Sequence, residues 1–429
     1  MSRYKKREFD MKKHLNRRGL LASAAALAAL PLAARAQDTT AQATPPATPP
    51  ATPDATQATP PATPDTTAQT PPADAAPQPA GPGVALSIGT YATDADAGMY
   101  PIGSYISSDD FHVWPPRAGV VNASWGAVGG PKFYNYVVDE QDDGRICVYD
   151  NQWQKLGDVS SGGKSPAYLS IDASGKWLAA ANYGTGNIAI FPLDASTGLP
   201  GTPVLIQNKG KGKNPDRQEG PHAHWVQFAP GNGRIFSIDL GTDEVLTYTF
   251  DDSTGRVGDK NRALKLPGGS GPRHMVFSPD GEHVYIVSEL ANTVTVATMG
   301  NGGVLESEQT ISTLPKGYTD HSQAAHIALN RAGTKLYVSN RGHNSIAIFA
   351  IDKNGKLSVQ DIVSSGGDWP RMFALLEDQY LAQQPRLLVA HQNSNTVVPF
   401  HVQPDGSLVQ TGAILSIPKP VFIGFELQG

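Results

Sequence analysis

The sequence predicts an all-β fold, a seven-bladed β-propeller of four-stranded antiparallel blades closed into a ring by the C-terminal strand. One pattern recurs at intervals of roughly 50 residues, at 221–240, 271–290 and 324–341. Each copy alternates β-branched and aromatic runs with turns, and proline and glycine join the copies. The repeats lack the 3.6-residue periodicity of a helix. Repeats of this length without helices are typical of propeller blades.

The blades follow one another along residues 84–429. Their expected starts, in order, are Val84, Asn122, Ser165, Pro221, Gly271, Ala324 and Trp369. Tight turns that need a positive φ angle carry glycine, at Gly175, Gly281 and Gly333. After seven blades, residues 420–425 are left over as one strand. We expect this strand to pair with the first strand, at 84–91, and so to remove an exposed sheet edge and lock the ring.

Two segments precede the propeller. Residues 1–36 combine a basic start, a short apolar run and an Ala-Arg-Ala cleavage site at 34–36, which predicts a secretory signal peptide. The pair Arg17-Arg18 before the apolar run predicts the twin-arginine route of export; an ordinary Sec signal is the alternative. Residues 37–83 are rich in Ala, Thr and Pro and predict a disordered linker.

Charge and cysteine content narrow the functional classes. The whole chain has a formal charge of −5, and removal of the signal segment, whose net charge is +7, leaves −12. An acidic mature protein argues against nucleic acid and anionic membranes as partners. The single Cys147 lies in a strand pattern and is expected to be a buried apolar residue. We therefore expect a periplasmic or secreted protein that binds a small molecule.

Polar residues recur at two fixed offsets within the repeats. Four residues before the anchor positions Phe228, Phe277, Leu329 and Leu375 stand His224, Arg273, Ala325 and Arg371. Twelve residues after two of these anchors stand Glu289 and Arg341. The first set should open the innermost strands, so we expect these polar side chains to surround one central funnel. The alternative is that they only solvate a water-filled channel.

Several long motifs in a fixed order match a known family. They are Gly89-Thr90-Tyr91, Ala181-Asn182-Tyr183-Gly184, Arg217 to His224, Asp239 to Asp243, Gly271 to His274, Ser339 to His343 and Trp369-Pro370-Arg371. In these motifs residues 84–425 closely resemble the propeller-type lactonases, typified by bacterial 6-phosphogluconolactonase and including fungal carboxy-muconate cyclases. The resemblance implies a hydrolase that opens a sugar lactone to its acid.

The resemblance also implies which residues act. It assigns His224, Arg273, Glu289 and Arg341 to lactone chemistry, and the expected substrate-binding residues are Arg217, His222, Arg371 and Asn182. Two positions depart from the family pattern, because His326 stands where a Glu is common and Met372 where a His is usual.

The expected chemistry is hydrolysis by acid-base catalysis without a metal or other cofactor. A neutral His224 would serve as general base, since its ordinary pKa is near 6.5. Glu289 would orient the imidazole or relay the proton, and the arginines would stabilise the oxyanion and bind any anionic group of the substrate.

Other functions are less well supported. The His222-x-His224 spacing occurs in some metal sites, but no acidic ligands of matching pattern accompany it. A serine hydrolase would need a G-x-S-x-G elbow, which the sequence lacks. A non-enzymatic periplasmic binding scaffold and a muconate-type lactonising cycloisomerase are the alternatives. Because phosphorylated sugar lactones are cytosolic, export points to an unphosphorylated lactone.

Overall fold

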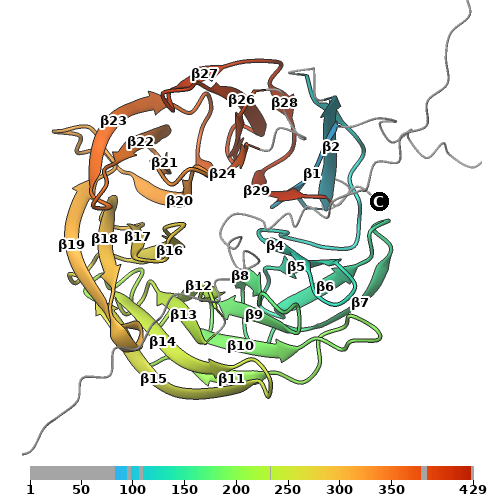
Figure 1. Ribbon diagram of the computed structural model, residues 1–429. Coiled ribbons are helices and arrows are strands. Elements are labelled where there is room, and N and C mark those ends of the chain that lie inside the picture. The colour runs from blue at the N-terminus through green and yellow to red at the C-terminus, as the bar shows by residue number, and fades with distance from the viewer. Residues whose placement is uncertain (1–82, 94–97, 106–109, 232, 378–383, 427–429) are drawn as a thin grey trace, which may run out of the picture. The chain divides into compact units, whose positions relative to one another are not determined.

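The computed structural model describes residues 83–93, 98–105, 110–231, 233–377 and 384–426. These residues form seven β-sheets arranged as a ring, which confirms the predicted propeller (Figure 1). The predicted signal peptide and, apart from Gly83, the predicted linker lie outside the described residues and stay predictions. Within the described part of the chain, no helix is long and apolar enough to cross a membrane.

Each blade is an antiparallel sheet whose strands follow one another from the axis of the ring to its rim. Blade one has β29 (Pro420–Phe425), β1 (Gly83–Thr90), β2 (Met99–Tyr105) and β3 (His112–Val113). Blade two has β4 (Gly126–Gly129), β5 (Tyr134–Asp139), β6 (Arg145–Tyr149) and β7 (Lys155–Ser160). Blade three has β8 (Pro166–Ile171), β9 (Trp177–Asn182), β10 (Asn187–Pro192) and β11 (Val204–Gln207).

The remaining blades follow the same order. Blade four has β12 (Ala223–Phe228), β13 (Arg234–Asp239), β14 (Glu244–Asp251) and β15 (Arg256–Lys265). Blade five has β16 (Pro272–Phe277), β17 (His283–Ser288), β18 (Thr293–Met299) and β19 (Leu305–Ser312). Blade six has β20 (Gln323–Leu329), β21 (Lys335–Arg341), β22 (Ser345–Ile351) and β23 (Leu357–Ser364). Blade seven has β24 (Pro370–Leu376), β25 (Arg386–His391), β26 (Thr396–Val402) and β27 (Leu408–Gln410).

Two details differ from the regular pattern. Blade seven carries a fifth strand, β28 (Leu415–Ser416), which pairs with β26 beside β27, so two short pieces share the outer edge. The described residues contain one 3-10 turn, η2 (Asn301–Gly303), and are otherwise strands and loops. The predicted turn glycines do adopt positive φ angles of 71° at Gly175, 76° at Gly281 and 66° at Gly333.

Burial is concentrated between the blades. Seven clusters of buried hydrophobic residues occur in the described part of the chain, and one lies at each of the seven junctions between neighbouring sheets. Val287 of blade five and Val338 of blade six, for example, share one cluster and are both fully buried. Cys147 lies in the cluster between blades one and two and is 1% exposed, as predicted. Each blade therefore depends on both neighbours for its core.

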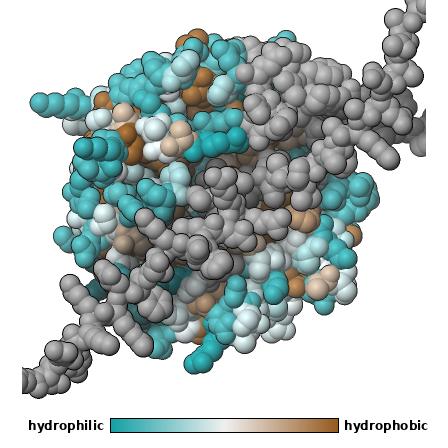
Figure 2. All heavy atoms as spheres, in the orientation of Figure 1, coloured by the Kyte–Doolittle hydropathy of each residue, from teal (hydrophilic) through white to brown (hydrophobic). Residues whose placement is uncertain are grey.

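The outer surface is mostly polar. In Figure 2 the described residues on the visible face are mainly hydrophilic, with scattered hydrophobic side chains between them. The most exposed large hydrophobic side chains include Leu205 on β11 and Val409 on β27, both on outermost strands. Isolated apolar residues of this kind are normal on a soluble surface.

The C-terminal strand closes the ring as predicted. β29 pairs antiparallel with β1, with Ile88 opposite Ile423, and becomes the innermost strand of blade one. Figure 1 shows this join between the red C-terminal strand and the blue first strand. Leu86, Leu388 and Ile423 meet in the core between blades one and seven. The first and last segments of the propeller thus form one sheet.

Deletion of β29 tests the closure. Removing residues from Pro420 onward exposes the partners of Val421, Phe422 and Ile423, which are at most 5% exposed. At 1.5–3 kcal/mol per buried side chain, the expected loss is about 5 kcal/mol or more, with loss of cooperative unfolding. Urea denaturation measures this, with Val409→Ser on the exposed outer strand as control. A truncated chain that unfolds at the same urea concentration as the control would contradict the closure.

Candidate active site

A β-bulge recurs near the start of the innermost strands. The register shifts between Pro166 and Tyr168, Ala223 and Trp225, Pro272 and His274, Ala324 and Ile327, and Pro370 and Met372. The extra residues in blades four, five and seven are His224, Arg273 and Arg371, three of the predicted site residues. A bulge re-aims the side chain of the extra residue. The fixed offset seen in the sequence is therefore the bulge position of blades four, five and seven.

Below the bulge residues, a second layer of side chains surrounds the axis of the ring. One comes from each blade, and they are Trp125, Tyr168, Trp225, His274, His326, Met372 and Phe422. They pack against one another around the axis. Trp125 stacks on Tyr168 at 4.1 Å between ring centroids and reaches His274, three blades away, at 5.4 Å. This layer closes the floor of the funnel, and it contains both residues that depart from the family pattern.

Glu289 follows directly after β17, and it is only 2% exposed. Its carboxylate forms ion pairs with three guanidinium groups: Arg217 at 2.7 Å, Arg341 at 2.9 Å and Arg273 at 3.2 Å. Burial alone would raise the pKa of Glu289, but the three guanidinium charges hold it well below its ordinary value. Glu289 is therefore an ionised carboxylate at neutral pH.

A fourth arginine joins from blade seven. The Arg371 guanidinium donates to the hydroxyl of Tyr91 at 2.6 Å, and that hydroxyl donates to the Glu140 carboxylate at 2.5 Å. Arg371 also lies 3.8 Å from the Glu140 carboxylate. We call the four residues Arg217, Arg273, Arg341 and Arg371 the arginine cage. Four guanidinium groups face two carboxylates, so the cage carries surplus positive charge.

The neighbouring positive charges affect the pKa of Arg273. Burial, together with the charges of Arg341 and Arg371, lowers the pKa of Arg273 to about 9, which leaves its guanidinium charged at neutral pH. Arg273 is 3% exposed and donates to the carbonyl oxygen of Ala325 at 2.8 Å. An anion, or an oxyanion that forms during a reaction, would relieve this excess of charge.

His224 is a neutral imidazole beside the cage. Burial, followed by the charge of Arg273, lowers the pKa of His224 well below its usual 6.5. Its ring is 5.2 Å from that of His274 and 5.5 Å from that of Tyr183, centroid to centroid. Among the described residues its Nδ1 atom has no hydrogen-bond partner. A neutral imidazole with an unbonded ring nitrogen can accept a proton during a reaction, although its lowered pKa makes the resulting imidazolium a strong acid that readily returns the proton.

Two predicted binding residues do not reach the cage. The side chain of Asn182 is fully buried, and its amide donates to the Ser161 carbonyl at 3.0 Å, so it anchors the loop that leads into blade three. His222 stacks on Tyr183, 4.5 Å away and 17° from parallel, and its Nδ1 contacts the Tyr183 carbonyl. His222 therefore supports Tyr183, whose hydroxyl accepts from Arg217 at 3.2 Å. The predicted Arg217 lies in the cage.

The structure adds site residues that were not predicted. Tyr183 is the neighbour of Asn182 in the sequence, and Tyr91 and Glu140 lie in loops after β1 and β5. Tyr91 and Tyr183 both stand in motifs that match the family. Glu140 lies twelve residues after Val128 and Tyr183 twelve residues after Ile171, the positions of blades two and three that correspond to the anchors of the other blades. The offset that found Glu289 and Arg341 could therefore have found both.

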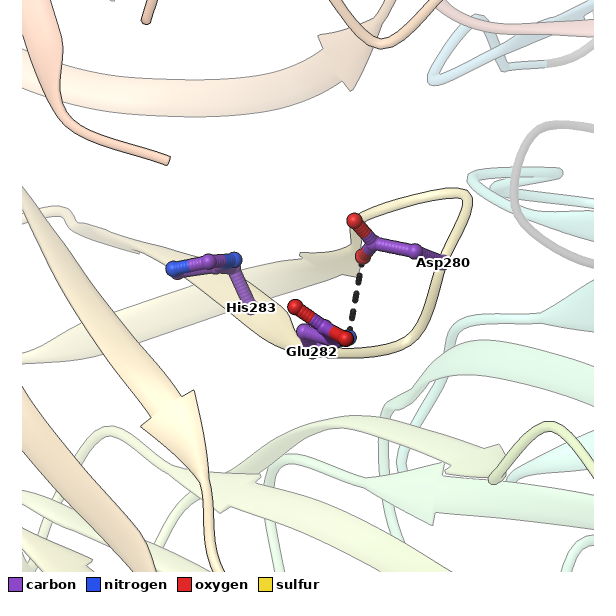
Figure 3. A group of neighbouring side chains, drawn as sticks. All are labelled: Asp280, Glu282 and His283. Carbon is purple, nitrogen blue, oxygen red and sulfur yellow. Dashed lines mark hydrogen bonds between the residues drawn. The ribbon is translucent and has the colours of Figure 1, made fainter. Parts of the chain in front are cut away.

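A metal site was not predicted, and that expectation stays a prediction. In the described part of the chain one group could hold a metal ion, Asp280, Glu282 and His283, on the turn between β16 and β17. Figure 3 shows these side chains on an open loop, where the Asp280 carboxylate accepts the backbone N–H of Glu282 at 3.0 Å. This turn lies at the opposite end of β16 from Arg273, so it is separate from the cage.

The comparison with known proteins agrees with this geometry. The family described as "Lactonase, 7-bladed beta-propeller" matches residues 85–425. The chain belongs to this lactonase family. One relative is the 6-phosphogluconolactonase of Bacillus subtilis (strain 168), which is 31% identical over 269 residues. These residues make up 62% of this chain and 74% of the relative.

Solved structures of similar proteins match the lactonase fold over the whole propeller. A protein from Lactobacillus plantarum is 29% identical with a TM-score of 0.72, and the match covers 80% of this chain and 99% of that chain. The periplasmic gluconolactonase PpgL of Pseudomonas aeruginosa is 27% identical with a TM-score of 0.71, with the same coverage.

Loss of the Glu289 charge tests the electrostatic account of this site. Glu289→Gln leaves three arginines without their shared counter-ion, and breaking a buried ion pair from one side costs about 3–5 kcal/mol. The matched control is Glu308→Gln, which breaks a surface ion pair between Glu308 on the outer strand β19 and Lys356 in the turn before β23. Urea denaturation should show a much larger loss for Glu289→Gln. Equal losses in the two variants would contradict the account.

Proposed function

We propose that this lactonase-family protein hydrolyses a sugar lactone to the open-chain acid. The observation that carries the proposal is the neutral, buried His224 beside an arginine cage with surplus positive charge. The family and the relative from Bacillus subtilis support a hydrolase that acts on lactones. The substrate and the residue roles are the proposed part.

The proposed reaction starts with a water molecule. His224 accepts a proton from the water as its oxygen attacks the lactone carbonyl carbon. The carbonyl oxygen becomes an oxyanion, and guanidinium groups of the cage, Arg273 and Arg341 among them, stabilise its charge. The bond from the carbonyl carbon to the ring oxygen then breaks. The imidazolium of His224 returns its proton to the departing ring oxygen, which gives a carboxylic acid and a hydroxyl. The carboxylic acid then releases its proton to solvent and becomes a carboxylate.

Glu289 has a different role from the one expected. An ionised carboxylate with three guanidinium partners is a poor proton relay, since protonation would leave the buried arginines without their counter-ion. We assign to Glu289 the positioning of Arg217, Arg273 and Arg341. Tyr91 and Glu140 position Arg371 in the same way.

The proposed substrate is an unphosphorylated sugar lactone such as gluconolactone. The predicted signal peptide would export the protein from the compartment where phosphorylated sugar lactones occur. A structural neighbour is a periplasmic gluconolactonase, which supports both the compartment and the substrate class.

Substitution of His224 tests the proposed base. His224→Ala should lower kcat on glucono-δ-lactone by about 10²–10⁴, the usual contribution of a positioned acid-base group. Activity in EDTA should match the untreated enzyme, because the arginines supply the positive charge. The control is His112→Ala on the outermost strand β3. A pH-stat assay corrected for spontaneous hydrolysis measures the rates. If wild type and His224→Ala hydrolyse every lactone equally, the proposal fails.

The pH profile gives a second test. The base must be neutral in the free enzyme, and the pKa of His224 lies well below 6.5. The parameter kcat/KM reports ionisations of the free enzyme, so the midpoint of its acid limb should lie below pH 6.5. Activity should stay level from pH 7.5 to 6.5. Arg371→Met removes one charge that lowers this pKa and should move the limb upward. A wild-type limb above pH 6.5 would contradict the assignment.

A further inference from the structure

We infer that a second, polar subsite lies beside the arginine cage, at the ring closure, and that it binds the hydroxylated tail of an unphosphorylated sugar lactone. The inference rests on the proposed function and specifies its substrate. A hollow of about 480 Å³ is lined there by Tyr91, Gln392, Asn393, Asn395 and Lys419. This volume is within the range of small-molecule sites, and every lining residue can form hydrogen bonds.

The backbone at the rim of the hollow is held in an uncommon conformation. Lys419 has a φ angle of 40°, in the left-handed region that non-glycine residues rarely adopt. Its N–H donates to the side-chain oxygen of Asn395 at 2.8 Å, and its carbonyl accepts the N–H of Tyr91 at 3.0 Å. Such conformations persist where surrounding contacts fix them, often at ligand sites. The Lys419 ammonium is thus carried on a fixed segment between blades seven and one.

Gln392 also supports a ligand site at the hollow. Its backbone is fixed by an N–H bond to the Trp369 carbonyl at 3.1 Å. Its side-chain oxygen Oε1 is buried and has no hydrogen-bond partner among the described residues. A buried acceptor without a partner is costly, and a ligand hydroxyl would supply the missing donor.

The hollow adjoins the reaction site through Tyr91. Tyr91 lines the hollow, and its hydroxyl accepts from Arg371 of the cage at 2.6 Å. A lactone whose carbonyl meets the cage beside His224 can therefore extend its substituents past Tyr91 toward Gln392 and Lys419.

The lining residues indicate what kind of tail fits. Three neutral amides, Gln392, Asn393 and Asn395, each offer donors and an acceptor, which is the pattern that sugar hydroxyls require. Lys419 is the one cation among the lining residues. A phosphate dianion is usually met by several guanidinium, ammonium or backbone N–H groups. The hollow therefore fits a polyol chain better than a phosphorylated one.

The test compares lactones with and without hydroxyl groups. We would measure kcat/KM of the full mature protein for glucono-δ-lactone and for δ-valerolactone, which has the same ring without hydroxyls. Gln392→Leu and Lys419→Met should each lower the ratio of the two values by about tenfold, the effect of one well-placed hydrogen bond. Lys353→Met, on the exposed turn between β22 and β23, is the matched control and should keep the wild-type ratio.

The measured ratios and affinities either support the subsite or overturn it. Equal changes for both lactones, or an unchanged ratio, would overturn it, as would a higher kcat/KM for 6-phosphogluconolactone than for glucono-δ-lactone. If the wild type opens no lactone, the proposed function fails, and calorimetry with gluconate then tests the subsite alone. Gluconate binding that weakens about tenfold in Gln392→Leu, compared with Lys353→Met, would support it. Undetectable binding, or equal binding in the two variants, would overturn it.

Discussion

The site depends on one buried carboxylate that is shared by three arginines. Guanidinium groups from the loop before blade four and from blades five and six converge on Glu289, which has almost no contact with solvent. Like charges at this distance would repel one another strongly in a poorly solvated site, and a central anion makes their assembly possible. Glu289 fixes the geometry of the cage and leaves it positively charged. Burial, followed by the charge of Arg273, lowers the pKa of His224 and so favours its neutral form.

The propeller fold makes this convergence possible in two ways. The β-bulge at the start of the innermost strands of blades four, five and seven turns one side chain of each toward the site, so residues far apart in sequence become neighbours. In the layer below, Trp125 and Tyr168 stack on each other next to the axis. Ring closure by β29 then brings Tyr91, from the start of the propeller, next to Arg371 near its end.

Much of the fold and part of the site could be predicted from the repeats. The fixed offsets found His224, Arg273 and Arg371 because the bulge recurs at one position of the repeat. The family motif, which suggested Asn182 as a binding residue, pointed one residue away from the side chain that reaches the cage. Asn182 occupies the end of the second strand, where Asn340 in blade six likewise binds a loop carbonyl, and its neighbour Tyr183 reaches the cage instead.

Other features depend on which side chains pair across the ring, and the repeat does not show this. Glu140 stands at the repeat position of Glu289, but its contact with Arg371 joins blade two to blade seven in the closed ring. The ionisation of Glu289 likewise follows from its three partners, which the sequence does not reveal.

The central claim is that Glu289 is a permanent negative charge that holds the arginines. Its most direct test is carboxyl carbon NMR of the labelled protein, with Glu289→Gln to assign the signal. The account predicts that the Glu289 signal stays that of a carboxylate from pH 8 down to its ordinary pKa of 4.5. A titration midpoint between pH 5 and 8 would make Glu289 a proton carrier and contradict the account.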